Sequence, residues 1–254
     1  MRFSANLGFL WNDRALPDAI RAAAVAGFDG VECHFPYAFD RADVRKALIE
    51  TGLPMVGLNT RPGDVGVGDF GLCAIPGREA EAREAISDAI EYAEAIGCRS
   101  VHVMAGKADG REAYRTFRSA LTIAADLAEE AGLTILIEPI NTRDVPGYFL
   151  SRTEQAMEMI SDLDRPNVKL MFDCYHMQIM EGDLTRTLER NLASIGHIQI
   201  AGVPSRQEPD SGELNYRYLF QALQDLGYDG FIGAEYRPKG RVEEGLGWLK
   251  SFRD

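Results

Sequence analysis

The chain has 254 residues, of which 46% are hydrophobic and 26% are charged, and its formal net charge is −12. This length is typical of one (β/α)8 barrel, and a chain of this size can bury a large core without disulfides or structural metals. The acidic balance argues against a nucleic-acid partner, because binding to phosphate backbones requires clustered Lys and Arg.

Short strand-like runs alternate with longer helical patterns along the whole chain. The eight predicted strands are Arg2–Leu7, Gly30–Cys33, Leu53–Leu58, Ser100–Met104, Thr134–Glu138, Val168–Asp173, Ile195–Ile200 and Phe231–Glu235. The predicted helices are Pro17–Ala26, Asp40–Glu50, Glu79–Ile96, Arg111–Ala131, a helix that begins at Thr153, and then Asp183–Asn191, Tyr216–Leu226 and Val242–Phe252. Glycines directly follow several of these helices, as expected where the backbone must adopt a positive φ.

Eight alternating units predict a parallel sheet covered by helices, because each crossover must carry the chain back over a sheet face. Eight strands can close into a barrel and so remove exposed sheet edges. The alternative is an open doubly wound sheet, but no GxGxxG follows the first strand and the chain contains no P-loop. We therefore expect an α/β fold, a TIM barrel, with one domain over residues 1–254.

The sequence also indicates a cellular setting. Cys33, Cys73, Cys98 and Cys174 are scattered and form no CxxC pair, so we expect reduced, buried thiols. The chain start lacks a basic and then apolar leader, and no apolar run approaches the roughly 20 residues that span a bilayer. These features favour a cytoplasmic enzyme without a membrane partner. Exposed barrel helices often carry subunit contacts, so a homo-oligomer is possible.

Polar side chains lie at the ends of four successive predicted strands. Glu138, Asp173, Gln199 and Glu235 each end or interrupt an apolar run, where a buried carboxylate is costly unless it is paired or metal-bound. Catalytic groups of (β/α)8 barrels lie at the carboxyl ends of the strands, so these four side chains should converge. Carboxylate and carboxamide oxygens suit Mg²⁺ or Mn²⁺ better than a softer metal.

The four histidines have competing interpretations. His176 follows Asp173 closely and either orients a substrate or a ligand, or is a packed loop histidine. His102 is either a substrate contact or a satisfied core histidine. His34, after the second strand, is a candidate for lining the pocket, whereas His197 is expected to be structural.

Three basic residues lie in loops after predicted strands. Arg206 could pair with a substrate carboxylate through two hydrogen bonds, or with Glu208 or Asp210 on the surface. Lys107 follows strand four and Arg61 follows strand three, and both are candidates for contacting an anionic or polyhydroxylated substrate.

Several segments resemble the hydroxypyruvate isomerase family, which lies within the xylose isomerase-like barrels. They are RFSANL at 2–7, FPY at 35–37, CAIPGRE at 73–79, LIEPIN at 136–141, FDCYHMQIMEGDLT at 172–185, GHIQIA at 196–201, RQEPDSGELNY at 206–216, EYRPKG at 235–240 and EEGLGW at 243–248. The resemblance covers essentially the full length and includes both the strand ends and the loops.

The resemblance implies a divalent-metal site at Glu138, Asp173, Gln199 and Glu235, with Glu138 and Glu235 as the acid–base pair. It implies an aldose–ketose type isomerisation of hydroxypyruvate to tartronate semialdehyde, with the metal stabilising an enediolate. His176, Arg206, His102 and Lys107 are then the expected substrate contacts.

Alternatives remain at the level of the substrate. A similar branch isomerises 2-oxo-tetronates, which are one carbon longer, and the segment at 58–72 resembles that branch more closely. The segment EPINTRDVPGY at 138–148 instead resembles hydroxypyruvate isomerase more closely, so the substrate stays open between the two. Sugar 3-epimerases usually carry His at the strand-seven metal position, so Gln199 counts against them. An abasic-site endonuclease would need a basic surface and more histidine ligands. A non-catalytic sugar-binding barrel would not need two bases at the metal.

Overall fold

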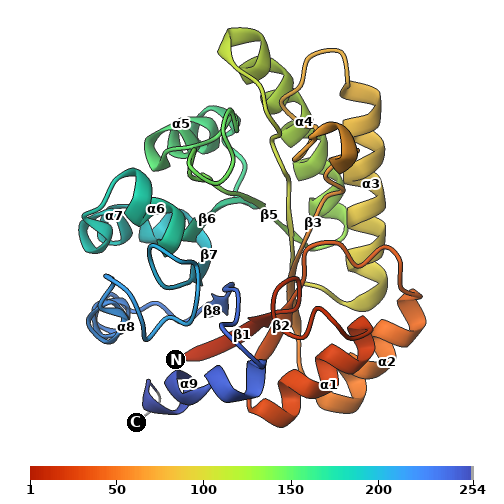
Figure 1. The fold of residues 1–254 in the computed structure, drawn as a ribbon. Helices are drawn as coiled ribbons and strands as arrows, with labels where there is room; N and C mark the ends of the chain where they lie inside the picture. Colours follow the sequence, from red (N-terminus) through yellow and green to blue (C-terminus); the bar gives the residue numbers. More distant parts are fainter. Residues whose placement is uncertain (253–254) are drawn as a thin grey trace.

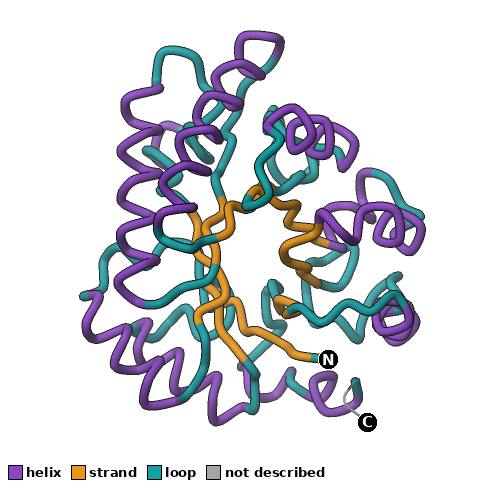
Figure 2. The backbone as a smooth tube through the Cα atoms, turned by 180° about the vertical axis from the view of Figure 1, so that it is seen from behind, coloured by secondary structure: helices purple, strands orange, loops and turns teal. Residues whose placement is uncertain are grey.

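Eight parallel strands close into a barrel in the computed structural model, which describes residues 1–252 (Figures 1 and 2). The strands are β1 (Arg2–Asn6), β2 (Gly30–Glu32), β3 (Met55–Asn59), β4 (Ser100–His102), β5 (Thr134–Ile137), β6 (Val168–Asp173), β7 (Ile195–Ile200) and β8 (Phe231–Ala234). Each strand pairs with the next along the chain, and β8 pairs with β1. The predicted closed barrel is confirmed, and the open sheet is excluded.

Helices surround the ring of strands, as the view from behind shows (Figure 2). The α-helices are α1 (Leu16–Ala26), α2 (Arg41–Thr51), α3 (Glu79–Ile96), α4 (Gly110–Glu130), α5 (Thr153–Leu163), α6 (Cys174–Met180), α7 (Leu184–Asn191), α8 (Tyr216–Asp225) and α9 (Gly247–Ser251). Short 3-10 helices are η1 (Val65–Val67), η2 (Leu192–Ser194) and η3 (Val242–Gly245). Gly27, Gly52 and Gly97 end their helices with positive φ, as the sequence predicts.

Two predicted segments differ from the structure. Helix α6 was not predicted, and it begins immediately after β6 because the Asp173 carboxylate accepts a hydrogen bond from the Tyr175 backbone N–H at 2.7 Å. The predicted last helix is divided into η3 and α9, with Leu246 between them. Gly245 and Gly247 flank this break, and glycine is a poor helix former.

Strand β1 shows how the barrel separates its two faces. Phe3 points outward and packs edge-to-face against Phe220 of α8 and Trp248 of α9. Its neighbours Ser4 and Asn6 are buried on the other face and hydrogen-bond inside the barrel. Because side chains alternate along a strand, the FSAN sequence places apolar residues against the helices and polar residues in the interior.

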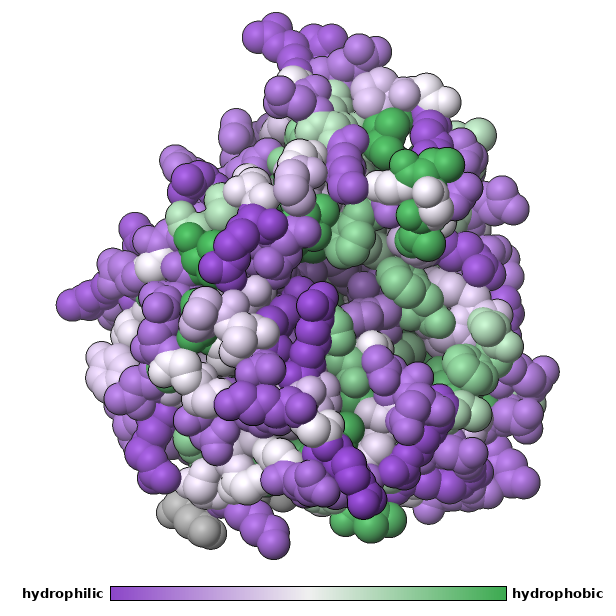
Figure 3. Space-filling model, in the orientation of Figure 1, coloured by the Kyte–Doolittle hydropathy of each residue, from purple (hydrophilic) through white to green (hydrophobic). Residues whose placement is uncertain are grey.

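The outer face seen in Figure 3 is mostly hydrophilic, with apolar residues in scattered groups and a hollow near its middle. None of the helices within residues 1–252 is long and apolar enough to cross a membrane.

The four cysteines provide a test of the fold. Cys33, Cys73, Cys98 and Cys174 are buried free thiols, and burial raises the thiol pKa, to about 12 for Cys73 and Cys98. Since the thiolate is the reactive form, we expect fewer than one thiol per native chain to react with Ellman's reagent within minutes. All four should react after unfolding in guanidinium. Rapid native reaction of two or more thiols would contradict this packing.

Candidate active site

A cavity of about 290 Å³ opens at the carboxyl ends of the strands. The residues that line it come from strand ends and from the loops that follow them. They are Phe9, His34, Phe35, Asn59, Phe70, His102, Met104, Glu138, Ile140, Asp144, Val145, His176, Arg206, Glu235 and Arg237. Most of the charged and histidine side chains predicted as site residues therefore surround one cavity.

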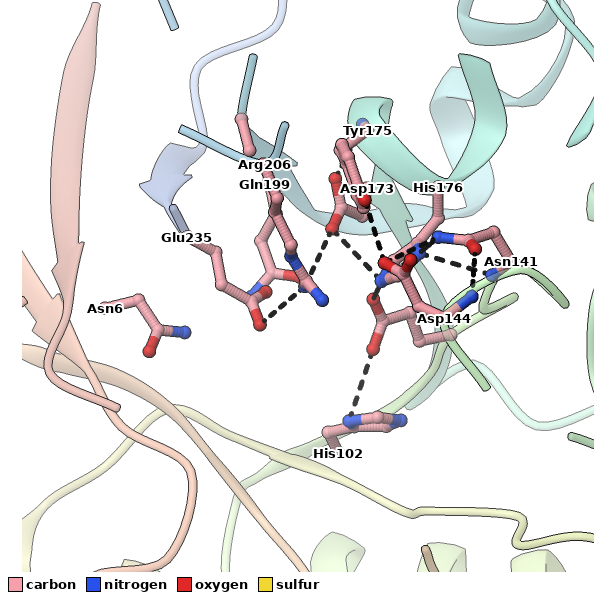
Figure 4. A network of polar contacts seen from close by, with 12 residues as sticks. Asn6, His102, Asn141, Asp144, Asp173, Tyr175, His176, Gln199, Arg206 and Glu235 are labelled. Atoms are coloured by element: carbon pink, nitrogen blue, oxygen red, sulfur yellow. Dashed lines mark hydrogen bonds and ion pairs between the residues drawn. The ribbon is translucent and has the colours of Figure 1, made fainter. Parts of the chain in front are cut away.

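Three buried carboxylates meet beside this cavity. Glu138 directly follows β5, Asp173 is the last residue of β6, and Glu235 directly follows β8. Arg206, from the loop after β7, lies among them: its Nη2 is 3.1 Å from Glu235 Oε1 and 3.6 Å from Asp173 Oδ2 (Figure 4). The predicted convergence of these strand ends is present in the structure, with a guanidinium at its centre.

The position of Arg206 is fixed by its backbone and by two aromatic rings. Its φ is 53°, a left-handed conformation that non-glycine residues rarely adopt. The guanidinium carbon lies 5.1 Å from the ring of Phe9 and 5.0 Å from that of Tyr175. The alternative pairing with Glu208 or Asp210 on the surface is not seen, because the side chain turns inward.

Two of the three carboxylates, those of Glu138 and Asp173, have raised pKa values. Burial raises the pKa of Glu138 well above its ordinary value, and the nearby charges of Glu235 and Asp173 raise it further. Burial likewise raises the pKa of Asp173, to about 7, although Arg206 opposes this shift. Arg206 itself remains charged, since Glu235 and Asp173 raise its pKa despite burial.

The hydrogen bonds of His176 determine its neutral tautomer. Its Nδ1 accepts the Asn141 backbone N–H at 3.2 Å and lies 2.6 Å from Asn141 Nδ2 (Figure 4). The Asn141 amide is oriented in turn by the Asp144 backbone N–H, which donates to Asn141 Oδ1. The ring proton therefore lies on Nε2, which is 3.6 Å from Glu138 and 3.5 Å from Asp173. The alternative of a packed loop histidine differs from the structure in one respect, because His176 lies in α6.

Two further histidines approach the glutamates. His34 Nε2 lies 3.0 Å from Glu235 Oε1, and His34 lines the cavity. His102 Nδ1 lies 3.7 Å from Glu138 Oε2, and neither ring nitrogen of His102 has a hydrogen-bond partner within residues 1–252. Burial lowers the pKa of His102 to about 3, helped by His34. A neutral, unpartnered imidazole beside the cavity can contact a substrate hydroxyl.

The donor set fits a hard divalent cation. Buried oxygens of Glu138, Asp173 and Gln199 have no hydrogen-bond partner in the described part of the chain. Ligand atoms of Glu138, Asp173 and His176 lie within 4.8 Å of one another. The Nε2 proton of His176 argues against ligation through that atom, so the oxygens match the predicted Mg²⁺ or Mn²⁺ set better.

Lys107 and Arg61 lie outside the residues that line the cavity. Lys107 is exposed and donates to the Gly68 carbonyl at 2.7 Å. Arg61 pairs with Asp88 at 3.1 Å and lies over the ring of Tyr37. The structure gives both residues partners on the surface and does not bring them to the carboxylates.

Sequence reasoning missed Glu32, the last residue of β2. Its carboxylate is buried and lies 2.7 Å from His197 Nε2 and 2.8 Å from Gln199 Nε2. Burial opposes its charge, but His197 and the hydrogen bonds of Gln199 and Ser4 lower its pKa to about 2. Glu32 carries the same signal as the four selected residues, a polar side chain at a strand end.

Three other residues were also missed. Asp144 and Arg237 line the cavity, and Asn141 orients His176. Asn141 and Asp144 lie in the loop after Glu138, so the polar run NTRD after the fifth predicted strand could have identified them.

Comparisons with known proteins agree with this architecture. The profile of the family described as "Xylose isomerase-like TIM barrel" matches residues 20–252. The 2-oxo-tetronate isomerase of Cupriavidus necator is 50% identical, over 99% of this chain and 98% of that protein. The hydroxypyruvate isomerase of Escherichia coli is 39% identical over all of both chains. A Brucella melitensis structure described as AP endonuclease, family 2, is 44% identical, with a TM-score of 0.95 over 100% of this chain and 99% of that one.

The raised pKa of Asp173 predicts how the free energy of unfolding changes with pH. Its folded-state pKa of about 7 exceeds the ordinary 3.8, so its contribution is fully present below pH 3.8 and is lost as the pH rises towards 7. Asp173→Asn cannot ionise and escapes this loss. In EDTA, the free energy of unfolding of the variant relative to wild type should rise with pH, by at most about 1.4 kcal/mol per pH unit.

Urea denaturation at several pH values between 4 and 8 measures this difference. The exposed Asp210→Asn is the matched control and should show no such trend. A constant difference between Asp173→Asn and wild type across this range would show that Asp173 is not held protonated.

Proposed function

We propose that this chain, which belongs to the xylose isomerase-like TIM barrel family, moves a carbonyl group between C2 and C3 of a short 3-hydroxy-2-oxo acid. The chain is an isomerase, because its full-length relatives include named isomerases. One observation carries this proposal. Two buried glutamates, Glu138 and Glu235, border a cavity that also presents the cation Arg206. Such a site can transfer protons at neighbouring carbons of a small anion.

Two acids share this chemistry. Hydroxypyruvate has three carbons and would give tartronate semialdehyde, whereas a 2-oxo-tetronate has four carbons and would give the 3-oxo acid. Relatives named 2-oxo-tetronate isomerase are 38% to 50% identical to this chain, and relatives named hydroxypyruvate isomerase or putative hydroxypyruvate isomerase are 39% to 44% identical, so both acids are candidates.

Arg206 is our candidate for recognition of the substrate carboxylate. Its Nε is buried and has no hydrogen-bond partner in residues 1–252, so one donor remains free while Nη2 contacts Glu235. Arg237 lines the same cavity and provides a second cation near Phe9. We assign substrate hydroxyl contacts to His102 and His176, which burial keeps neutral.

We propose that Glu138, Asp173, Gln199 and Glu235 hold a divalent cation, Mg²⁺ or Mn²⁺. The support is the unpartnered buried oxygens of Glu138, Asp173 and Gln199, together with the hard, all-oxygen chemistry that Glu235 completes. When bound, such a cation would supply positive charge for the oxygens on C2 and C3 of the substrate.

The two glutamates differ in a way that suggests their roles. Glu235 contacts the permanently charged Arg206 and also His34, so we assign it as the base that takes the proton from C3. Glu138 lies instead beside His102 and His176, which burial keeps neutral, so we assign it to deliver a proton to C2. The remaining proton passes from the oxygen on C3 to the oxygen on C2, and the carbonyl has then moved. Proton exchange with solvent then returns Glu235 to the carboxylate and Glu138 to the acid before the next turnover.

The Brucella structure carries the name of an endonuclease, which is a different reaction class. A DNA substrate would require a basic surface, and this chain has a net charge of −12. Its four histidines also supply few ligands for a multi-zinc centre. We therefore propose a small hydroxy or keto acid as the substrate and no nucleic-acid partner.

The proposed reaction is tested by NMR in D2O with hydroxypyruvate and, separately, with a 2-oxo-tetronate. Each acid is incubated with the protein in EDTA, Mg²⁺ or Mn²⁺. We expect one acid to be converted, with deuterium entering at C2 of the product, because the proton on Glu138 exchanges with solvent. Absence of conversion of both acids, together with cleavage of an abasic-site oligonucleotide, would replace this proposal with the endonuclease alternative.

The assigned glutamates are tested by substitution. Glu138→Gln and Glu235→Gln remove a proton-transfer group and should each lower kcat by about 10²- to 10⁴-fold. Circular dichroism should show that both variants remain folded. The matched control is Glu94→Gln, on the exposed face of α3, which should retain full activity. Wild-type turnover in both glutamate variants would refute the proposed acid–base pair.

A further inference from the structure

A second polar network lies inside the barrel, around Glu32. Its Oε2 lies 2.7 Å from both Ser4 Oγ and His197 Nε2. Its Oε1 accepts from Asn6 Nδ2 at 3.1 Å and from Gln199 Nε2 at 2.8 Å. All five side chains are buried, so water cannot replace these partners. Glu32 takes no part in the proposed proton transfers, yet it contacts the proposed cation ligand Gln199 directly.

The direction of these hydrogen bonds can be deduced from the backbone. The Gly8 N–H can only donate, and it donates to Asn6 Oδ1 at 2.9 Å. The opposite end of the Asn6 amide, Nδ2, must therefore face Glu32 and donate to Oε1. Since Oε1 already accepts there as part of a carboxylate, Gln199 must also present its NH2 group to Glu32.

The oxygen of Gln199 therefore points away from Glu32. Gln199 Oε1 is buried and has no hydrogen-bond partner in the described chain. In the barrel, Gln199 is paired in register with Asp173 on one side and with Gly233 on the other, and Figure 4 shows it between Asp173 and Glu235. A buried acceptor oxygen is thus held towards the carboxylate cluster.

Gly233 of β8 leaves the space that Glu32 occupies. A Cβ at this position would lie 2.5 Å from both carboxylate oxygens of Glu32. The glycine is therefore explained by the close approach of the carboxylate.

We propose that Glu32 is a positioning residue: it fixes the amide of Gln199 so that Oε1, and not the NH2 group, faces Asp173 and Glu235. This inference rests on the proposed function only for its consequence, which is that Gln199 serves as an oxygen ligand. A free amide beside carboxylates would turn its NH2 group towards them, because carboxylates accept hydrogen bonds. The carboxylate of Glu32 prevents this reversal. Partners of metal ligands act in this way, and their loss typically costs about 10- to 100-fold in metal affinity.

The orientation itself is tested in the wild-type protein by NMR of side-chain amides. The Gln199 NH2 signal is assigned by its absence from Gln199→Met. We expect slow exchange with solvent and a nuclear Overhauser contact to the Asn6 NH2 group, since both donate to one oxygen. Exchange as fast as that of the exposed Gln224 would overturn the proposal. This measurement needs neither cation nor substrate, so it is independent of whether the protein isomerises either acid.

The consequence is tested by Mn²⁺ affinity, measured by electron paramagnetic resonance, in parallel with turnover. Glu32→Met keeps the side-chain length but removes the acceptor, and it should weaken Mn²⁺ binding by about 10- to 100-fold. Glu32→Gln keeps one acceptor oxygen for Asn6 and Gln199, because Ser4 and His197 can accept from its NH2 group. It should therefore stay close to wild type, whereas a role for the charge of Glu32 predicts loss in both variants.

Two comparisons separate positioning from a general loss of structure. Ser4→Ala removes a hydrogen bond on the Oε2 side and should leave Mn²⁺ affinity unchanged. The double variant Glu32→Met with Gln199→Met should bind Mn²⁺ no more weakly than Gln199→Met alone, since Glu32 acts through Gln199. Additive losses would overturn the proposal. If Glu32→Met does not fold, the amide exchange and Glu32→Gln results decide the question.

Discussion

The burial of three carboxylates around one guanidinium is the constraint on which the site depends. Closure of the barrel brings the ends of β5, β6 and β8 together, so Glu138, Asp173 and Glu235 cannot separate to reduce their repulsion. Arg206 supplies one positive charge between two of them, which leaves Glu138 with a raised pKa. The raised pKa of Glu138 thus follows from the geometry of the barrel and from where one loop places its arginine.

The barrel interior holds buried carboxylates in two networks, and only one of these networks gives every carboxylate oxygen a hydrogen-bond partner. In the network around Glu32, one carboxylate faces four hydrogen-bonding partners and both of its oxygens are occupied. In the carboxylate cluster, Glu138 and Asp173 retain buried oxygens without partners in the described chain. A satisfied buried network is rigid, whereas an unsatisfied one has capacity to bind a cation or a substrate. Gln199 links the two, because its NH2 group donates to Glu32 and its Oε1 has no partner within residues 1–252.

The sequence predicted the architecture well because period and length are local signals. The eight strands and most helices were found from short apolar runs and terminal glycines, and the strand-end rule located Glu138, Asp173, Gln199 and Glu235. Helix α6 was not predicted because it begins with Asp173 as its N-cap residue. Asp173 was interpreted only as a metal ligand, so its role as a helix cap was overlooked.

Contacts between loops were harder to predict. The inward turn of Arg206 depends on a positive φ and on Phe9 and Tyr175, which are about 200 and 30 residues away, respectively. Lys107 had the same residue chemistry but is held on the surface by the Gly68 carbonyl. Glu32 was overlooked although it met the strand-end rule, because its partners lie on the adjacent β1 and, across the barrel, on β7. No sequence spacing encodes those distances.

The uncharged side chain of Gln199 can be explained from the sum of the charges around it. Under the proposed function, three carboxylates, one guanidinium and one divalent cation are neutral in total, and protonation of Glu138 makes the site positive. A carboxylate at position 199 would cancel that positive charge and would also repel Glu32 at 2.8 Å. An amide oriented by Glu32 instead offers an oxygen without a formal charge. The site can then accept an acid as substrate, although the chain as a whole is strongly negative. Local arrangement, and not net charge, determines what this cavity can bind.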